Sequence, residues 1–197
     1  MQWKRKKRGG ELGVHVNPLD VIQKYYDPGS KAYYFLVLHG RLVAKKACEL
    51  GRTVAHLNPD MKFIEEASLL HDIGMFLSNA PKLGCYGHNE YVCHGYLGRE
   101  LLDREGLPRH ALVCERHVGI GITLEEIKTN SLPLPPREMV PVSVEEKIVC
   151  FADKFYSKSE HDLLREKPLE RVRKMIRAYG EDKLKIFDEW SQLFTLS

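Results

Sequence analysis

The chain has 197 residues, of which 43% are hydrophobic and 29% are charged, and its formal net charge is +3. This composition is typical of a single soluble globular domain with a substantial core. No stretch approaches the roughly 18 consecutive apolar residues that a spanning helix needs, which excludes a membrane-embedded protein.

Much of the positive charge falls in residues 4–8, which are all lysine or arginine. Gly9 and Gly10 follow in place of an apolar stretch, which argues against a signal peptide. We interpret residues 1–16 as a solvated basic tail and not as a contact for nucleic acid or membrane. The rest, residues 17–197, is expected to form one helical domain with a core at 30–158.

The five cysteines are odd in number and scattered, and no CxxC pair is present. This pattern favours reduced, buried thiols in the cytoplasm and makes a cysteine zinc ribbon unlikely to form.

Helix start and stop signals dominate the chain from Asn17 onward. Asn17 and Ser30 are expected to cap the first two helices, and Gly51 to end the second in a left-handed conformation. Asn58 with Pro59 marks the start of the third helix. The predicted helices in this half cover residues 18–26, 31–50, 59–74, 89–105 and 108–119.

The second half continues with helices. Thr123 with Glu126, and Ser143 with Glu146, form capping-box patterns that open a short helix and a longer one reaching Lys158. The proline-rich residues 131–142 between them are expected to be a loop. Two amphipathic helices within residues 168–195 close the chain. Because no strict period-two alternation occurs, no sheet is expected, and the fold class is all-α, a helical bundle.

Four predicted helices each carry one polar residue on an apolar face: His39, His94, His117 and Asp153. A single histidine in such a place is more often a hydrogen-bonded core residue than a ligand. A buried carboxylate, however, needs a partner, and a cation shared with imidazoles is one. A fifth element has adjacent His71 and Asp72 at a helix end, where a terminal turn brings both side chains to one centre.

The order of these residues along the chain resembles that of the HD superfamily of metal-dependent phosphohydrolases, specifically its members with four histidines and two aspartates. The resemblance covers residues 30–158 and includes local context such as Gly95 and Gly98 beside His94. It implies a helical bundle with two divalent cations. By this resemblance the metal ligands are His39, His71, Asp72, His94, His117 and Asp153.

The resemblance further implies that His39, His71, Asp72 and Asp153 hold one cation, and that Asp72 bridges to a second bound by His94 and His117. The mixed nitrogen and oxygen donors suit iron or manganese, with zinc possible, better than magnesium or calcium. Two such cations activate a hydroxide that attacks a phosphate ester or anhydride, so His71 and Asp72 are catalytic candidates.

Three cations near the expected ligands are candidates for holding the phosphate of a substrate: Arg116, Lys154 and Lys158. Each could equally face solvent, and Lys154 is also a catalytic candidate. His110 could orient a ligand, donate a proton to the leaving group, or lie on the surface.

The leading hypothesis from the sequence is an enzyme that hydrolyses a nucleotide or a small phosphorylated metabolite. The alternatives are a catalytically silent nucleotide-binding sensor and a di-iron oxygenase on the same scaffold. The sequence indicates neither the substrate nor the oligomeric state.

Overall fold

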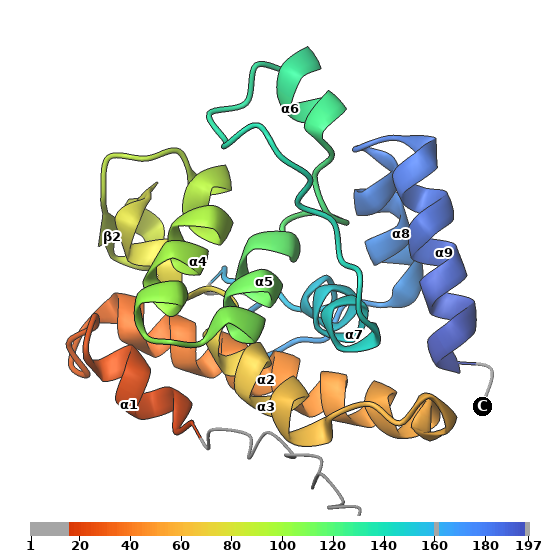
Figure 1. Cartoon of the computed structure of the whole chain (residues 1–197), viewed down its shortest axis with the longest axis horizontal. Helices are drawn as coiled ribbons and strands as arrows, with labels where there is room; N and C mark the ends of the chain where they lie inside the picture. Colours follow the sequence, from red (N-terminus) through yellow and green to blue (C-terminus); the bar gives the residue numbers. More distant parts are fainter. Residues whose placement is uncertain (1–15, 160–161, 196–197) are drawn as a thin grey trace, which may run out of the picture.

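The computed structural model describes residues 16–159 and 162–195, so most of the predicted basic tail lies outside the described residues. The described chain is mainly helical, as expected for an all-α protein. The longest helix, α2 (Lys31–Thr53), packs along α3 (Met61–Leu70) and against α7 (Val144–Asp153). Figure 1 shows α2 and α3 side by side, with helices α4 to α9 above them and α1 below one end of α2.

Two pairs of helices stand on either side of α7 in Figure 1. On one side α4 (His94–Arg104) packs against α5 (Pro108–Arg116), and on the other α8 (Leu169–Arg177) packs against α9 (Glu181–Thr195). The short helix α1 (Pro18–Gln23) contacts α3, and α6 (Leu124–Thr129) extends from the bundle above α5 and α7.

The core consists of two large clusters of buried side chains. One joins α2, α3, α7 and α9, and in it the ring of Phe151 stacks on that of Phe187 at a centroid distance of 4.7 Å. The other joins α1, α2, α4 and α5. On α2, His39 lies between Leu36 of the second cluster and Val43 of the first, so the boundary between the clusters carries a polar residue.

Several helix boundaries differ from those predicted. Gly51 is inside α2 and is not left-handed; the glycine leaves room for Met61, whose sulfur would lie only 2.8 Å from a Cβ at this position. The cap of α3 is Asp60, whose carboxylate accepts a hydrogen bond from the Phe63 amide at 3.0 Å, whereas Asn58 adopts the left-handed conformation. A short acidic side chain therefore replaces the expected Asn-Pro start.

The predictions for the later helices were also only partly right. The capping box of α6 is complete, whereas that of α7 is half formed. Ser143 accepts from the Glu146 amide, but the Glu146 carboxylate accepts from Arg116 and from the Val142 amide and not from the Ser143 amide. Helix α7 ends at Asp153 and not near Lys158. A small antiparallel sheet, not expected from the sequence, pairs β1 (Asn79–Ala80) with β2 (Cys85–Tyr86). Strands of two residues are too short to produce a period-two signal.

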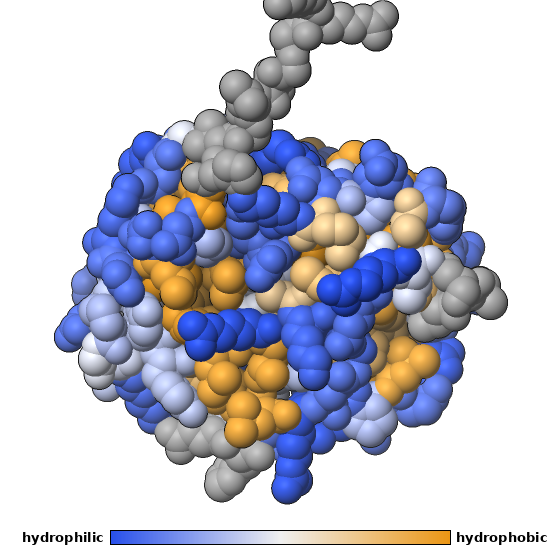
Figure 2. Space-filling model, turned by 90° about the horizontal axis from the view of Figure 1, so that it is seen from below, coloured by the Kyte–Doolittle hydropathy of each residue, from blue (hydrophilic) through white to orange (hydrophobic). Residues whose placement is uncertain are grey.

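The side of the molecule where α1, α2 and α3 lie is mainly hydrophilic, with smaller hydrophobic areas between charged side chains (Figure 2). This agrees with the burial of the apolar face of α2 against α3 and α7. Among the described residues, no helix combines the length and the apolar character needed to cross a membrane.

Candidate metal centre

His71 and Asp72 lie where the chain leaves helix α3. The helix ends at Leu70, His71 keeps a helical conformation, and Asp72 turns to φ −105° and ψ 11°. A 3-10 helix, Ile73–Leu77, follows at once. The turn brings the side chains of adjacent residues to the same buried centre, as the dipeptide at a helix end predicted.

Three of the histidines share one local arrangement. Each follows a helical turn directly, and its Nδ1 lies within hydrogen-bond distance of the carbonyl oxygen three residues earlier. The distances are 2.6 Å from His71 to Ser68, 2.5 Å from His94 to Tyr91 and 2.7 Å from His117 to Cys114. A carbonyl only accepts, so Nδ1 carries the proton and donates it. The Nε2 atom of each ring is thereby directed to the centre.

The two carboxylate oxygens of Asp72 face different histidines. Its Oδ2 lies 3.4 Å from Nε2 of His39 and 3.0 Å from Nε2 of His71. Its Oδ1 lies 3.2 Å from Nε2 of His94 and 3.4 Å from Nε2 of His117. Asp72 therefore stands between two pairs of imidazoles, which is the position that a bridging carboxylate requires.

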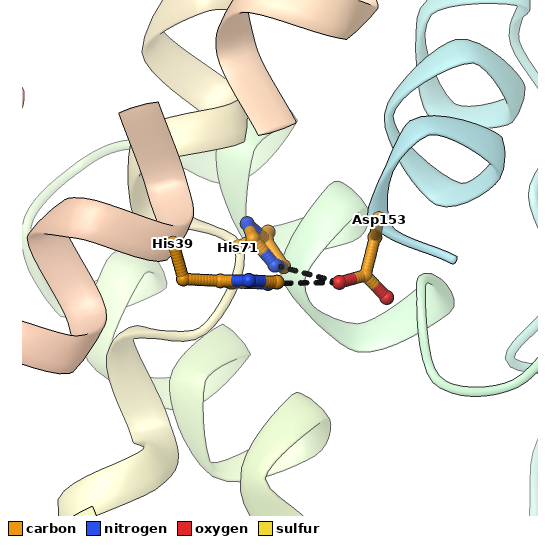
Figure 3. Close-up of side chains that lie close together, drawn as sticks. All are labelled: His39, His71 and Asp153. Carbon is orange, nitrogen blue, oxygen red and sulfur yellow. Dashed lines mark hydrogen bonds and ion pairs between the residues drawn. The ribbon is translucent and has the colours of Figure 1, made fainter. Parts of the chain in front are cut away.

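Asp153, the last residue of α7, completes the first of these two sides. Its Oδ1 lies 2.9 Å from Nε2 of His39 and 3.5 Å from Nε2 of His71, and Figure 3 shows both rings pointing at this oxygen. Ligand atoms of His39, His71 and Asp153 lie within 4.8 Å of one another, as do those of His71, Asp72 and His117. All six predicted ligands thus converge from separate elements.

Several atoms of this cluster that could bind a metal lack the hydrogen-bond partners that buried polar atoms need. Both oxygens of Asp72 and Nε2 of His71 are buried without a well-aligned hydrogen bond, although charged or imidazole nitrogens lie near them. Leaving such atoms unsatisfied costs about 1–3 kcal/mol each. Oxygen and imidazole donors around this point fit one or two divalent cations of the iron, manganese or zinc type.

The electrostatics of the metal-free cluster agree with this fit. Burial lowers the pKa of His39 to about 4 and that of His117 to about 3, so both rings are neutral and can donate a lone pair. Burial also acts to lower the pKa of His71, but the charges of Asp72 and Asp153 outweigh it and raise that pKa to about 9. A cation bound here would replace the proton of His71.

Two lysines pair with the carboxylates of the cluster. Lys158 Nζ lies 2.7 Å from Asp72 Oδ2, and Lys154 Nζ lies 2.6 Å from Asp153 Oδ2. Lys154 also donates to the carbonyl oxygen of His117 at 2.9 Å. Burial opposes the charge of each lysine, but the neighbouring carboxylates raise both pKa values, so both ammonium groups stay charged beside the centre.

The other two candidates lie elsewhere. His110 is buried against Glu66, with Nε2 3.3 Å from a carboxylate oxygen, and Phe63 packs on its ring. Arg116 forms an ion pair with Glu146 at 2.9 Å. Neither residue lines the cavities at the cluster, because α5 directs them to its contacts with α3 and α7 while His117 points inward. Their predicted roles in catalysis and substrate binding are not supported by this placement.

Two cavities open onto the cluster and share Tyr91, Gly119, Asp153, Lys154, Lys158 and Tyr179 in their walls. The first, the α6 cavity, has a volume of about 520 Å³ and reaches Ile122, Glu126, Asn130, Leu132 and Lys183. The second, the α8 cavity, has a volume of about 700 Å³ and reaches Pro81, Lys82, Leu83, Ser157, Lys167 and Met175. Both volumes lie within the range of about 300–1,000 Å³ usual for ligand sites.

Most residues in these walls are not marked by any motif in the sequence. Tyr91 could have been suspected because it lies one turn before His94, and its carbonyl accepts from that ring. Lys183 is in the first turn of an amphipathic helix, and its position at a cavity depends on how α9 packs. Lys167 is in the segment before α8, where sequence periodicity predicts nothing.

Comparison with known proteins agrees with this geometry. Residues 37–157, which include all six clustered side chains, match the HD domain family. The chain belongs to the HD domain family. The matched segment runs from α2 to just beyond α7, so the α8–α9 pair, which supplies Lys183 and Tyr179, lies outside it.

Three archaeal relatives resemble the HD domain chain. An uncharacterized protein of Methanocaldococcus jannaschii is 35% identical over 60% of this chain and 64% of its own length. A tRNA (cytidine(56)-2'-O)-methyltransferase of Thermoplasma volcanium is 31% identical over 71% of this chain and 35% of its own length. The Picrophilus torridus protein of the same name is 35% identical over 50% of this chain and 25% of its own length. The chain thus spans less than two thirds of each relative. No solved structure matches it.

Proposed function

We propose that this HD domain protein is a metal-dependent phosphohydrolase that cleaves a phosphate ester or anhydride of a nucleotide or small phosphorylated metabolite. The observation that carries the proposal is the placement of Asp72, whose two oxygens each face a pair of histidine Nε2 atoms. Membership of the HD domain family supports the same reaction class. The proposed location is cytoplasmic.

In this proposal His39, His71, Asp72 and Asp153 would hold one cation, while Asp72, His94 and His117 would hold a second. Iron or manganese is the first expectation and zinc the alternative. When bound, such cations supply charge neutralisation at the phosphoryl group and lower the pKa of water from about 16 to about 7.

The remaining side chains at the centre have positioning roles. Lys154 and Lys158 carry ammonium groups beside the two carboxylates and open onto both cavities, where they can hold the oxygens of a phosphate. Lys154 is also anchored to the carbonyl oxygen of His117, so its position is fixed relative to one predicted ligand. Ordered donors of this kind favour the charge that develops in phosphoryl transfer.

A phosphate carried by RNA is the second candidate substrate. It is favoured by the names of two relatives, which are described as tRNA (cytidine(56)-2'-O)-methyltransferases. Lys154 and Lys158 line both the α6 and the α8 cavity, so a phosphate held by them could carry groups that extend into each cavity.

The test is phosphate release from a panel of nucleotides, sugar phosphates and an RNA with a terminal phosphate, with added manganese or iron. We expect turnover by the wild type, and loss of at least 100-fold in Asp72→Ala and His71→Ala with the helical fold retained. Arg116→Lys is the matched control, because its ion pair with Glu146 lies away from the cavities. Metal binding without turnover of any phosphate would contradict the proposal and favour the sensor, and oxygen consumption by the iron form would favour the oxygenase.

A further inference from the structure

The α6 cavity has walls of two kinds. Near the centre it is bounded by His117 and Lys154, and along its sides by the apolar groups of Val92, Ile122 and Leu132. These apolar residues pack against a small core cluster beneath α6 that includes Ile127 and Met139. The walls therefore offer flat apolar contact to an organic group whose phosphate lies at the His/Asp cluster.

An ion pair between a buried lysine and a partly exposed glutamate lies in the wall of the same cavity. Lys183 on α9 is only 4% exposed, and its Nζ donates to Glu126 Oε2 at 2.6 Å and to the carbonyl oxygen of Gly121 at 2.9 Å. Glu126 Oε2 also accepts from the Thr123 amide at 2.7 Å. Burial opposes the ionisation of Glu126, but the bond from Lys183 holds its pKa below the ordinary value. The carboxylate of Glu126 is thus ionised, and these bonds hold both side chains in position.

The pair keeps unused hydrogen-bonding capacity. An ammonium group has three donors, of which Lys183 uses two on Glu126 and Gly121. Among the described residues, Glu126 Oε1 accepts no hydrogen bond, and Asn130 also lines the cavity. A free donor and a free acceptor therefore stand together beside apolar walls. Because the Glu126 side chain is 31% exposed, its second oxygen is accessible to a ligand.

We propose that Glu126 and Lys183 determine specificity by hydrogen-bonding the edge of a nucleobase that lies in the α6 cavity. A nucleobase combines apolar faces with an edge on which donors and acceptors are adjacent, which matches the walls and the pair. A sugar alone would place hydroxyl groups against Val92, Ile122 and Leu132. The substrate class is then a nucleoside monophosphate or a nucleotide at the end of a longer molecule. This inference rests on the proposed hydrolase function only for the position of the phosphate.

Nucleoside binding tests the inference without hydrolysis. Adenosine, guanosine, cytidine and uridine are titrated into the full chain by calorimetry, with ribose as the probe that lacks a base. We expect at least one nucleoside to bind the wild type, and Lys183→Met and Glu126→Gln each to weaken it by 10-fold or more. Lys185→Met and Glu125→Gln are the matched controls, since both residues are exposed neighbours of the pair and should leave binding unchanged.

The hydrolysis assay adds a second readout. The Glu126→Gln variant should raise KM for nucleoside monophosphates about 10-fold with little change in kcat, and leave ribose 5-phosphate unaffected. If no nucleoside binds the wild type, or if both variants bind as the wild type does, the inference is wrong even when phosphate esters are hydrolysed. If nucleosides bind as expected but no phosphate is released, the hydrolase proposal fails and the base site stands. Should Lys183→Met not fold, Glu126→Gln decides the outcome.

Discussion

Replacing Gly98 with alanine tests how the two halves of the metal centre are held together. An added Cβ would lie closer than 3.0 Å to Sγ of Cys114 and 3.0 Å from the backbone nitrogen of Gly74. Gly74 follows the His71-Asp72 turn by two residues, and Gly98 lies one turn after His94 on α4. Overpacking of this kind costs about 1–3 kcal/mol. At about 2 kcal/mol, and a urea slope of about 2 kcal/mol per M, the unfolding midpoint falls by about 1 M.

A double-mutant cycle identifies the contact responsible. Cys114→Ala removes the sulfur, and with it the hydrogen bond to the His71 carbonyl, at a cost of about 1 kcal/mol. In that background Gly98→Ala should cost less than about 1 kcal/mol, giving a coupling of about 1–2 kcal/mol in metal-free protein. Gly29→Ala is the control, because its Cβ would meet only the Asp27 side chain, at 3.6 Å. Costs that add within about 0.5 kcal/mol would refute the packing argument.

Three further outcomes are expected. Chelation should lower the melting temperature, and manganese or iron at about 100 times its Kd should raise it by about 5–10 °C. The His94→Ala substitution should reduce this increase, and an equal increase in the variant would exclude a role for His94 in metal binding. Glu115→Gln should lower the free energy of unfolding in urea by about 3–5 kcal/mol, because this buried carboxylate pairs with both Arg99 and Arg137. A loss below about 1 kcal/mol would show that these ion pairs do not stabilise the fold. Burial lowers the pKa of Lys167 to about 8, whereas the unfolded value is about 10.4. Below about pH 8 the folded state bears the cost of a buried charge, and this cost disappears as Lys167 loses its proton on raising the pH towards about 10.4. The stability of the wild type relative to Lys167→Met should therefore increase by about 1–2 kcal/mol over this range, and a difference that does not change with pH would contradict the shift.

The helices could be predicted from the sequence because they depend on local patterns, whereas the convergence of six polar residues was implied by their order along the chain, which resembles that of the HD superfamily. Caps such as Ser30 and Thr123 act within one turn of the chain, and the structure has both. The position of His39 on the apolar face of α2 also follows from helical periodicity. Adjacent residues on a regular helix point in different directions, so His71 and Asp72 can reach one centre only where the helix ends and the chain turns. This made the His71-Asp72 turn predictable.

The residues that surround the centre depend on tertiary packing, and their roles could not be read from spacing. Arg116 and His117 are neighbours, yet helix geometry sends one to Glu146 and the other to the cluster. His110 lies near the face of His117, but α3 places Glu66 opposite it. Lys183 is separated from His117 by more than sixty residues, and only the packing of α9 brings it to the same cavity.

The way the chain ends its helical turns explains why the centre has the arrangement it does. His71 and His117 each use Nδ1 to satisfy a carbonyl in the last turn of the helix that they follow, so one interaction completes the backbone and directs Nε2 inward. His94 donates from Nδ1 to the Tyr91 carbonyl, which also accepts from the His94 amide, and this bond directs its Nε2 inward in the same way. His39 lies in the middle of α2, and its buried Nδ1 has no hydrogen-bond partner. Its ring is therefore held by packing and by contacts of Nε2 with Asp153 and Asp72, with no bond from Nδ1 to the backbone among the described residues, which makes His39 the ligand whose orientation should depend most on whether a cation is bound.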